Sequence, residues 1–170
     1  MLSPEHKKFL YIEQCLVPGV FNFLINGAIA WALFRSVSSL GLWGEHGFGG
    51  DLLITAALLP ALTCLIVTPI INKQIRSGKT ATLASVLHED GGLSLQPVWL
   101  RALVLALVGV VIGALPFVAL LMMIEASSGS ISIGATDYAI FKAVWAALLA
   151  MLVTPYVGWW ALQAASQSED

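Results

Sequence analysis

The sequence predicts an all-α integral membrane protein: a four-helix transmembrane bundle built from two helical hairpins of the same topology. Three observations predict this class, namely an apolar composition, four uncharged stretches of membrane-spanning length, and an internal similarity at an offset of 86 residues. The 170 residues are expected to form a single membrane domain. Its expected parts, in order, are an interfacial helix (1–14), a first transmembrane hairpin (15–72), a cytoplasmic connection (73–101), a second transmembrane hairpin (102–162) and a cytoplasmic tail (163–170).

The composition excludes an ordinary soluble domain. Hydrophobic residues make up 58% of the chain and charged residues 11%, with a mean hydropathy of +0.87, whereas soluble domains carry roughly 25% charge. Eight Lys or Arg against ten Asp or Glu give a net charge of −2, so a basic surface for nucleic acid is not expected. The lipid bilayer is the predicted partner.

Four segments are long and apolar enough to cross the hydrocarbon core, which takes about 20 helical residues. None of them contains a charged residue. The segments are Cys15 to Phe34, Leu52 to Asn72, Ala102 to Ile124, and Ala143 to Leu162. The third has no polar side chain, which makes it the poorest candidate for lining a wet path.

The N-terminal segment has the features of a helix start, with Ser3 as a cap and Pro4 at the first helical position. Its uneven apolar side predicts an interfacial helix, which Pro18-Gly19 would let bend into the membrane. A straight extension of the first span is the alternative. No signal-peptide cleavage pattern is found, so the first span is expected to be retained.

The distribution of cations predicts the orientation, because Lys and Arg collect on the cytoplasmic side. Six lie on one side of the spans: Lys7, Lys8, Lys73, Arg76, Lys79 and Arg101. Only Arg35 and Lys142 lie on the other side. Both termini are therefore predicted to be cytoplasmic, in the plasma membrane and most simply in a bacterial inner membrane. The cytoplasmic connection has a possible short surface helix from Thr80 to His88.

The two hairpins resemble each other when the sequence is offset by 86 residues. Eight of the nineteen positions from Asp51 to Pro69 are identical to those from Asp137 to Pro155. Both segments end in Val-Thr-Pro, and Gly27-Ala28 recurs one offset later. We therefore predict an internal duplication. Because both hairpins start on the same side, the copies would be related by an axis along the membrane normal.

Small residues predict where helices pack closely. The pattern Ala57-x-x-x-Ala61 recurs as Ala143-x-x-x-Ala147, and the third span contains Gly109-x-x-x-Gly113. Packing within one chain is the first interpretation. A dimer interface through the two glycines is the alternative.

A polar patch is predicted on the first span, where the four-residue spacing of Asn22 and Asn26 places both amides on one helical face. If the first two helices are antiparallel neighbours, Asn26 lies near the level of Pro60 and Asn22 near that of Thr63 and Cys64. The ring of Pro60 frees the carbonyl of Ala56, which a carboxamide or a water could then satisfy. The patch is either interhelical glue or part of a small-solute site.

Two Thr-Pro pairs, Thr68-Pro69 and Thr154-Pro155, predict matched bends near the cytoplasmic ends of their helices. Each hydroxyl can fold back onto the preceding turn. Plain bending is one interpretation, and a gated mouth is the other.

Charged and aromatic residues gather at the predicted outer face. Asp51 and Asp137 are expected to cap their helices. Lys142 is expected either to extend outward or to pair with Glu125. Trp43 and Tyr138 are expected to be boundary anchors, with a ligand cage as the alternative.

No catalytic, metal or cofactor motif is present, because neither cysteine belongs to a C-x-x-C pair and no H-E-x-x-H or G-x-S-x-G sequence occurs. An enzyme is not expected, nor is a cofactor. The predicted function is permease-like or channel-like passage of a small solute by a homo-oligomer, such as a homodimer. The alternative is a non-catalytic scaffold or accessory subunit that docks to another membrane protein.

Overall fold

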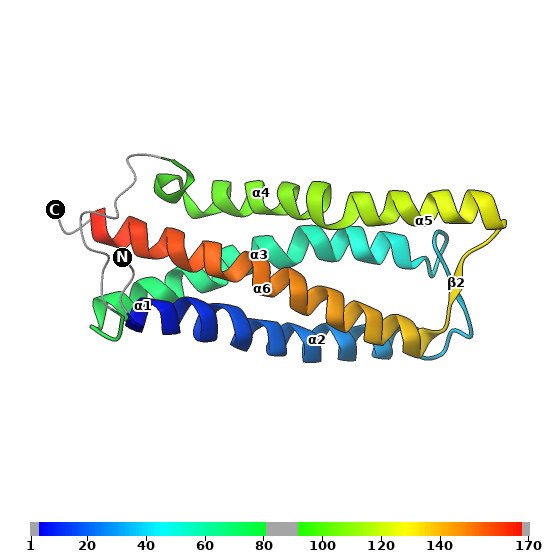
Figure 1. The fold of residues 1–170 in the computed structure, drawn as a ribbon, viewed down its shortest axis with the longest axis horizontal. Coiled ribbons are helices and arrows are strands. Elements are labelled where there is room, and N and C mark those ends of the chain that lie inside the picture. Colours follow the sequence, from blue (N-terminus) through cyan, green and yellow to red (C-terminus); the bar gives the residue numbers. More distant parts are fainter. Residues whose placement is uncertain (1–3, 81–91, 168–170) are drawn as a thin grey trace.

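The computed structural model describes residues 4–80 and 92–167, and over these residues the chain is mostly helical (Figure 1). Four helices are long and apolar enough to cross a membrane, which confirms this part of the prediction: Pro4–Phe34, Phe48–Arg76, Val98–Ser128 and Ala135–Ala164. Each is longer than the apolar stretch at its centre. The surface helix predicted from Thr80 to His88 falls, apart from Thr80, outside the described residues.

The first long helix consists of three consecutive segments: α1 (Pro4–Lys8), the π-helix η1 (Phe9–Leu16) and α2 (Val17–Phe34). It continues without a break through Pro18 and Gly19. The π-helix ends just before Pro18, where the amide of Val17 donates to the carbonyl of Ile12, five residues back. This wider turn lets the helix continue past a proline that has no N–H to donate.

The third long helix also has a π-helical segment directly before its proline. It consists of α4 (Val98–Val108), the π-helix η4 (Gly109–Ala114) and α5 (Leu115–Ser128), after a short 3-10 turn, η3 (Leu93–Leu95). Here the amide of Leu115 donates to the carbonyl of Val110, directly before Pro116. The other two long helices, α3 (Phe48–Arg76) and α6 (Ala135–Gln167), are α-helical throughout and contain their prolines internally.

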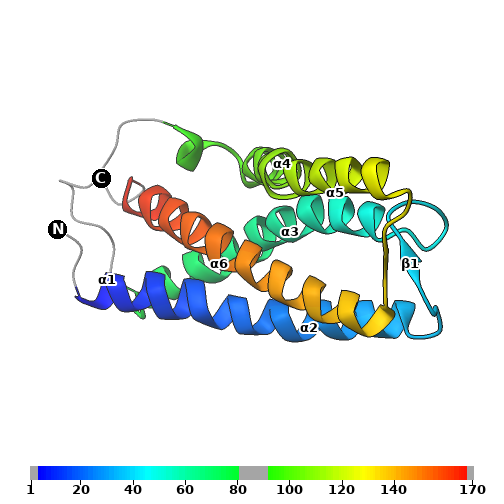
Figure 2. The same cartoon turned by 45° about the vertical axis from the view of Figure 1, so that its right-hand side comes forward.

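The second helix of each hairpin lies at the centre of the molecule, where α3 and α6 cross (Figures 1 and 2). The helix α2 packs mainly on α6, and α4 with η4 packs on α3. The first helix of each hairpin therefore packs on the second helix of the other hairpin. The crossing of α3 and α6 is filled by Leu59, Ala146, Leu149 and Ala150.

The two connections at the right-hand end of Figure 1 are joined by a short antiparallel pair of strands. In this pair β1 (Leu40–Gly41) lies opposite β2 (Ser132–Ile133), with Leu40 facing Ile133. Beneath them lies an apolar cluster that includes Leu42, Phe48 and Leu52. The start of α1 and the end of α6 lie together at the other end of the bundle (Figures 1 and 2).

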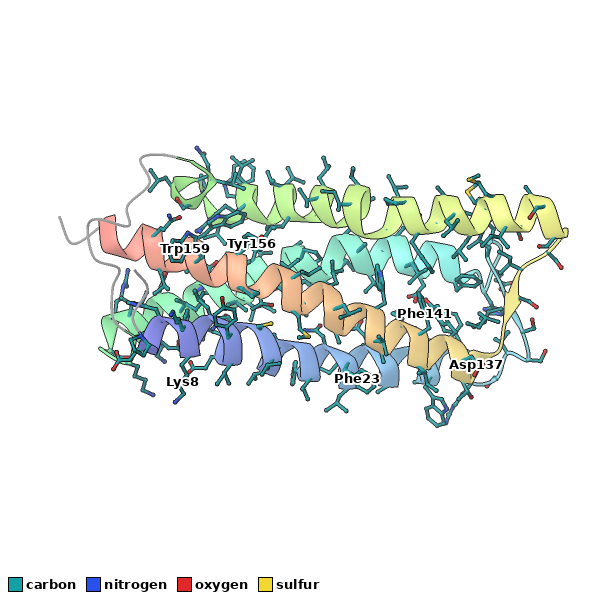
Figure 3. The ribbon with its side chains drawn as sticks, in the orientation of Figure 1. Lys8, Phe23, Asp137, Phe141, Tyr156 and Trp159 are labelled. Atoms are coloured by element: carbon teal, nitrogen blue, oxygen red, sulfur yellow. The ribbon has the colours of Figure 1, made fainter. Side chains whose placement is uncertain are left out.

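The outward faces of the long helices are apolar. Figure 3 shows Phe23 projecting from α2 away from the bundle, and Ile112 and Met123 are 70% and 71% exposed. Water-soluble monomers rarely expose continuous apolar surface of this kind.

Candidate functional site

A groove of about 620 Å³ between α2 and α3, here named the α2–α3 groove, combines polar and charged side chains. It exists because α2 packs mainly on α6, whereas α3 packs both on α6 and on α4 with η4, although α2 and α3 are consecutive in the chain. Its lining comes from α2 and α3, with Lys142 and Thr154 contributed by α6. The rim residues Phe21, Leu58 and Ile66 are exposed, so the groove is open along one side.

Several predicted patch residues line this groove, including Asn22, Asn26 and Thr63. The two amides do not bridge helices. The Nδ2 group of Asn22 donates to the carbonyl of Pro18 at 2.9 Å, and that of Asn26 donates to the carbonyl of Asn22 at 3.1 Å. Of the two alternatives for the patch, interhelical hydrogen bonding by these amides is therefore wrong, because α2 and α3 are separated by the groove.

The carbonyl of Ala56, which Pro60 leaves without its helical partner, is covered by η4. A Cβ atom added to Gly109 would overlap this carbonyl oxygen and would lie 2.9 Å from Pro60 Cγ. Only a glycine permits this approach. A carboxamide therefore does not satisfy this freed carbonyl, since the third long helix occupies that face of α3.

Cys64, the fourth predicted patch residue, does not line the groove. It is fully buried in a cluster with Ala102, Leu105 and Val157, between α3 and the helices α4 and α6. Its thiol donates to the carbonyl of Val98 at 3.8 Å. The structure therefore separates Cys64 from its neighbour Thr63, because adjacent helical residues point about 100° apart.

The two Thr-Pro pairs have different surroundings. Thr68 and Thr154 are both buried, and both helices continue past Pro69 and Pro155. The Oγ1 atom of Thr68 lies 4.0 Å from the thiol of Cys64, whereas that of Thr154 has no hydrogen-bond partner among the described residues. The hydroxyl of Thr68 therefore meets the preceding turn through the thiol of Cys64, whereas that of Thr154 does not bond to its preceding turn as expected. Thr154 lines the α2–α3 groove, and Thr68 does not.

An ion pair lies at the other end of the groove. Lys142 on α6 donates to both carboxylate oxygens of Asp51 on α3, at 2.7 Å to Oδ1 and 2.5 Å to Oδ2. The hydroxyl of Tyr138 donates to the same Oδ2 atom. The side chain of Lys142 is only 3% exposed and that of Asp51 is 19% exposed. A buried charge of this kind requires such a partner.

Three expectations at this end are wrong. Lys142 pairs with Asp51 and not with Glu125. Asp51 is not a cap, since α3 begins a turn earlier and its N-cap position is Gly47. Tyr138 is fully buried between Phe34 and Phe48, with ring centroids 5.4 and 5.5 Å away, so it is not a boundary anchor.

The cluster of Asp51, Tyr138 and Lys142 was missed because its members are 87 and 91 residues apart. One local signal was available. Lys142 directly precedes the fourth apolar stretch and follows Tyr138 by four residues, which places both side chains on one helical face. A lysine one turn inside a membrane-spanning helix needs a counter-charge.

The predicted packing residues serve contacts within the chain. A Cβ added to Gly27 would lie 3.0 Å from the Cβ of Ala143, and one added to Gly19 would lie 3.7 Å from the carbonyl oxygen of Ala147. Ala61 packs against the cluster around Cys64. Ala57 is half-buried, and Gly113 has a looser environment than Gly109, with its added Cβ 3.5 Å from Leu149.

Within residues 4–80 and 92–167, no group of three metal-ligating side chains occurs. Both cysteines are free thiols. No protein-family model, curated protein or solved structure matches the chain. The functional conclusion therefore depends on the geometry of the α2–α3 groove.

Proposed function

We propose that this chain is an integral membrane protein that provides a small solute with a passage through the bilayer. The single observation that carries the proposal is the α2–α3 groove. It extends along α2 from Val17 to Ile29 and along α3 from Asp51 to Val67, and three helices contribute polar groups to it. A polar lining distributed along the spans is costly in hydrocarbon unless it contacts water, a solute or another chain.

The membrane assignment is supported by the four long apolar helices and by the exposed apolar residues that surround them. The orientation with both ends in the cytoplasm is supported by the excess of cations on that side. The pairing of Lys142 strengthens it, since its charge is matched by Asp51. Arg35, whose guanidinium lies over the ring of Trp31, then remains at the predicted outer face without a carboxylate partner among the described residues. A bacterial inner membrane fits this arrangement.

The proposal includes an internal duplication. The helix α2 packs on α6, and α4 packs on α3. In each pair the first helix of one hairpin packs on the second helix of the other, which is the arrangement expected of two hairpins related by a two-fold axis. The ion pair breaks this symmetry, because the residue 86 positions before Lys142 is Ala56 and the one before Tyr138 is Leu52. Lys142 and Tyr138 of the second hairpin therefore have no equivalent in the first hairpin.

A second copy of the chain is the proposed cover for the open side of the groove. Exposed rim residues on both edges, including Phe21, Leu58 and Leu62, offer apolar surface for this contact. Between the two copies the polar groups would be enclosed away from lipid. A homo-oligomer is therefore part of the proposed function.

Cysteine accessibility tests the passage. In a variant with Cys15→Ser and Cys64→Ala, single cysteines are introduced at Asn22, Asn26 and Thr63, and reconstituted vesicles are treated with a charged, membrane-impermeant thiosulfonate. We expect all three to react, because a wet path ionises thiols and admits the reagent.

Ile112→Cys and Met123→Cys are the matched controls, since both side chains are exposed on the third long helix, away from the groove. Hydrocarbon surrounds them in the proposed arrangement, and they should not react. If the three groove positions are as unreactive as the controls, the passage is rejected.

An accessory subunit is the second candidate function. The observation that favours it is the same open groove, because its apolar rim also suits a transmembrane helix of a different protein. Purification in a mild detergent distinguishes the two. A stoichiometric foreign membrane protein favours the accessory subunit, and an isolated homo-oligomer favours the passage.

A further inference from the structure

The hydroxyl of Thr154 is the feature of the α2–α3 groove that packing explains least. The residue is fully buried, it lines the groove, and its Oγ1 atom has no hydrogen-bond partner among the described residues. Buried hydroxyls normally have a partner, and an exception calls for an explanation, of which a bound group is one.

Comparison with Thr68 shows why this hydroxyl is free. Thr68 lies 86 positions earlier, is equally buried, and contacts the thiol of Cys64 one turn before it. The residue one turn before Thr154 is Ala150, which has no polar group. Of the two equivalent threonines, only Thr154, which lines the groove, therefore has an unpaired hydroxyl among the described residues.

The two carboxamides of the groove present acceptors to a ligand. The Nδ2 groups of Asn22 and Asn26 both donate to carbonyls of their own helix. The Oδ1 atom of Asn22 accepts one long hydrogen bond of 3.3 Å from Asn26, and that of Asn26 has no partner among the described residues. A carboxamide oxygen has two lone pairs. The groups that remain available are therefore carbonyl oxygens, which require N–H or O–H donors.

The charge of the groove selects against ions. Its lining contains one cation and one anion, Lys142 and Asp51, and these two neutralise each other. The rest of the lining is uncharged, with apolar residues from Phe21 to Ile66. An ion in the middle of the groove would lose its hydration without meeting an opposite charge.

We infer that the α2–α3 groove binds a neutral molecule with hydroxyl or amide N–H groups, to which the hydroxyl of Thr154 and the carboxamide oxygens of Asn22 and Asn26 offer hydrogen bonds at successive positions along the groove. This inference rests on the proposed function and names its substrate class. The same donors occur on a small polyol or amide that enters from water and on the hydroxyl headgroup of a diacylglycerol that enters from lipid.

The experiment uses the full chain in vesicles of phosphatidylethanolamine and phosphatidylglycerol. In one arm, the permeation of glycerol and urea is measured by stopped-flow light scattering, beside that of potassium and glutamate. In the other, a photoreactive dioctanoylglycerol is cross-linked and its attachment sites are mapped by mass spectrometry. We expect a neutral probe to permeate or to label the groove, and the ions to be excluded.

Thr154→Val is the decisive variant, and Thr68→Val is its matched control. Losing one hydrogen bond should weaken permeation or labelling about five-fold in the first variant, and the control should retain the wild-type level. Because the hydroxyl of Thr154 has no partner among the described residues, its removal should not lower thermal stability, so a folding defect is separable from a binding defect.

The inference is overturned if the two variants lose the same signal, if ions permeate as well as the neutral probes, or if no neutral probe permeates or labels. Its failure differs from failure of the passage. Reactive cysteines at Asn22, Asn26 and Thr63 together with ion permeation would retain the passage and reject the substrate class. Labelling by the diacylglycerol without cysteine reactivity would retain the binding site and reject the passage.

Discussion

At the scale of single residues, the two partners of the ion pair between Asp51 and Lys142 differ in burial, because the lysine is almost fully buried and the aspartate is not. We expect Asp51→Ala to lower the free energy of unfolding by about 3 kcal/mol, since it leaves a buried ammonium without a counter-charge. Lys142→Met should cost less, because Asp51 keeps the hydroxyl of Tyr138 and partial access to water. Chemical unfolding in detergent measures both.

The double variant Asp51→Ala with Lys142→Met removes both charges and separates pairing from packing. It should be more stable than Asp51→Ala alone, because no charge is left buried, and the cycle of four proteins gives the coupling energy. If Asp51→Ala is no worse than Lys142→Met, or if the double variant shows no recovery, the ion pair does not hold α3 and α6 together.

At the scale of helices, the contact between η4 and α3 depends on one glycine. Gly109→Ala places a methyl group against the backbone of Ala56 and the ring of Pro60, and backbone atoms do not move aside as a flexible side chain does. We expect a loss of about 2 kcal/mol in the free energy of unfolding. Chemical unfolding in detergent is again the measurement.

Gly113→Ala is the matched control for this prediction. It lies one turn later in the same helix, and its added methyl group meets only the end of the Leu149 side chain at an ordinary contact distance. Its stability should stay within about 0.5 kcal/mol of the wild-type value. If the two variants lose the same free energy of unfolding, the effect comes from replacing a glycine in this helix and not from the close approach of Gly109 to α3.

At the scale of the whole molecule, the proposed orientation predicts which loops can be labelled from outside the cell. In the variant lacking Cys15 and Cys64, we introduce Ser39→Cys near β1 and Ser77→Cys after α3, both at exposed positions. A membrane-impermeant maleimide added to intact cells should label the first and spare the second.

Breaking the cells serves as the control, since it should make both positions reactive. Labelling of Ser77→Cys in intact cells would reverse the orientation. Labelling of neither position in broken cells would show that the two loops are covered, and the test would then use neighbouring exposed residues such as Ser38 and Gly78.

The four long helices follow from the sequence because their cause is local. An uncharged stretch of about 20 apolar residues satisfies its own backbone hydrogen bonds only as a helix. The ends of these helices extend beyond the apolar stretches, and the two π-helical segments before Pro18 and Pro116 were not predicted. Both prolines are visible in the sequence, but the turn that accommodates each one is a property of the folded helix.

Composition and spacing by themselves were enough to predict four apolar helices and to place Asn22 and Asn26 on one face. Which helices become neighbours was decided only in three dimensions, by the crossing of α3 over α6. The packing of α3 against α6 brings Lys142 to Asp51, and its packing against α4 and α6 buries Cys64. The position of Lys142 in the sequence indicates that it needs a counter-charge, but which carboxylate supplies it, 91 positions away, depends on how whole helices pack.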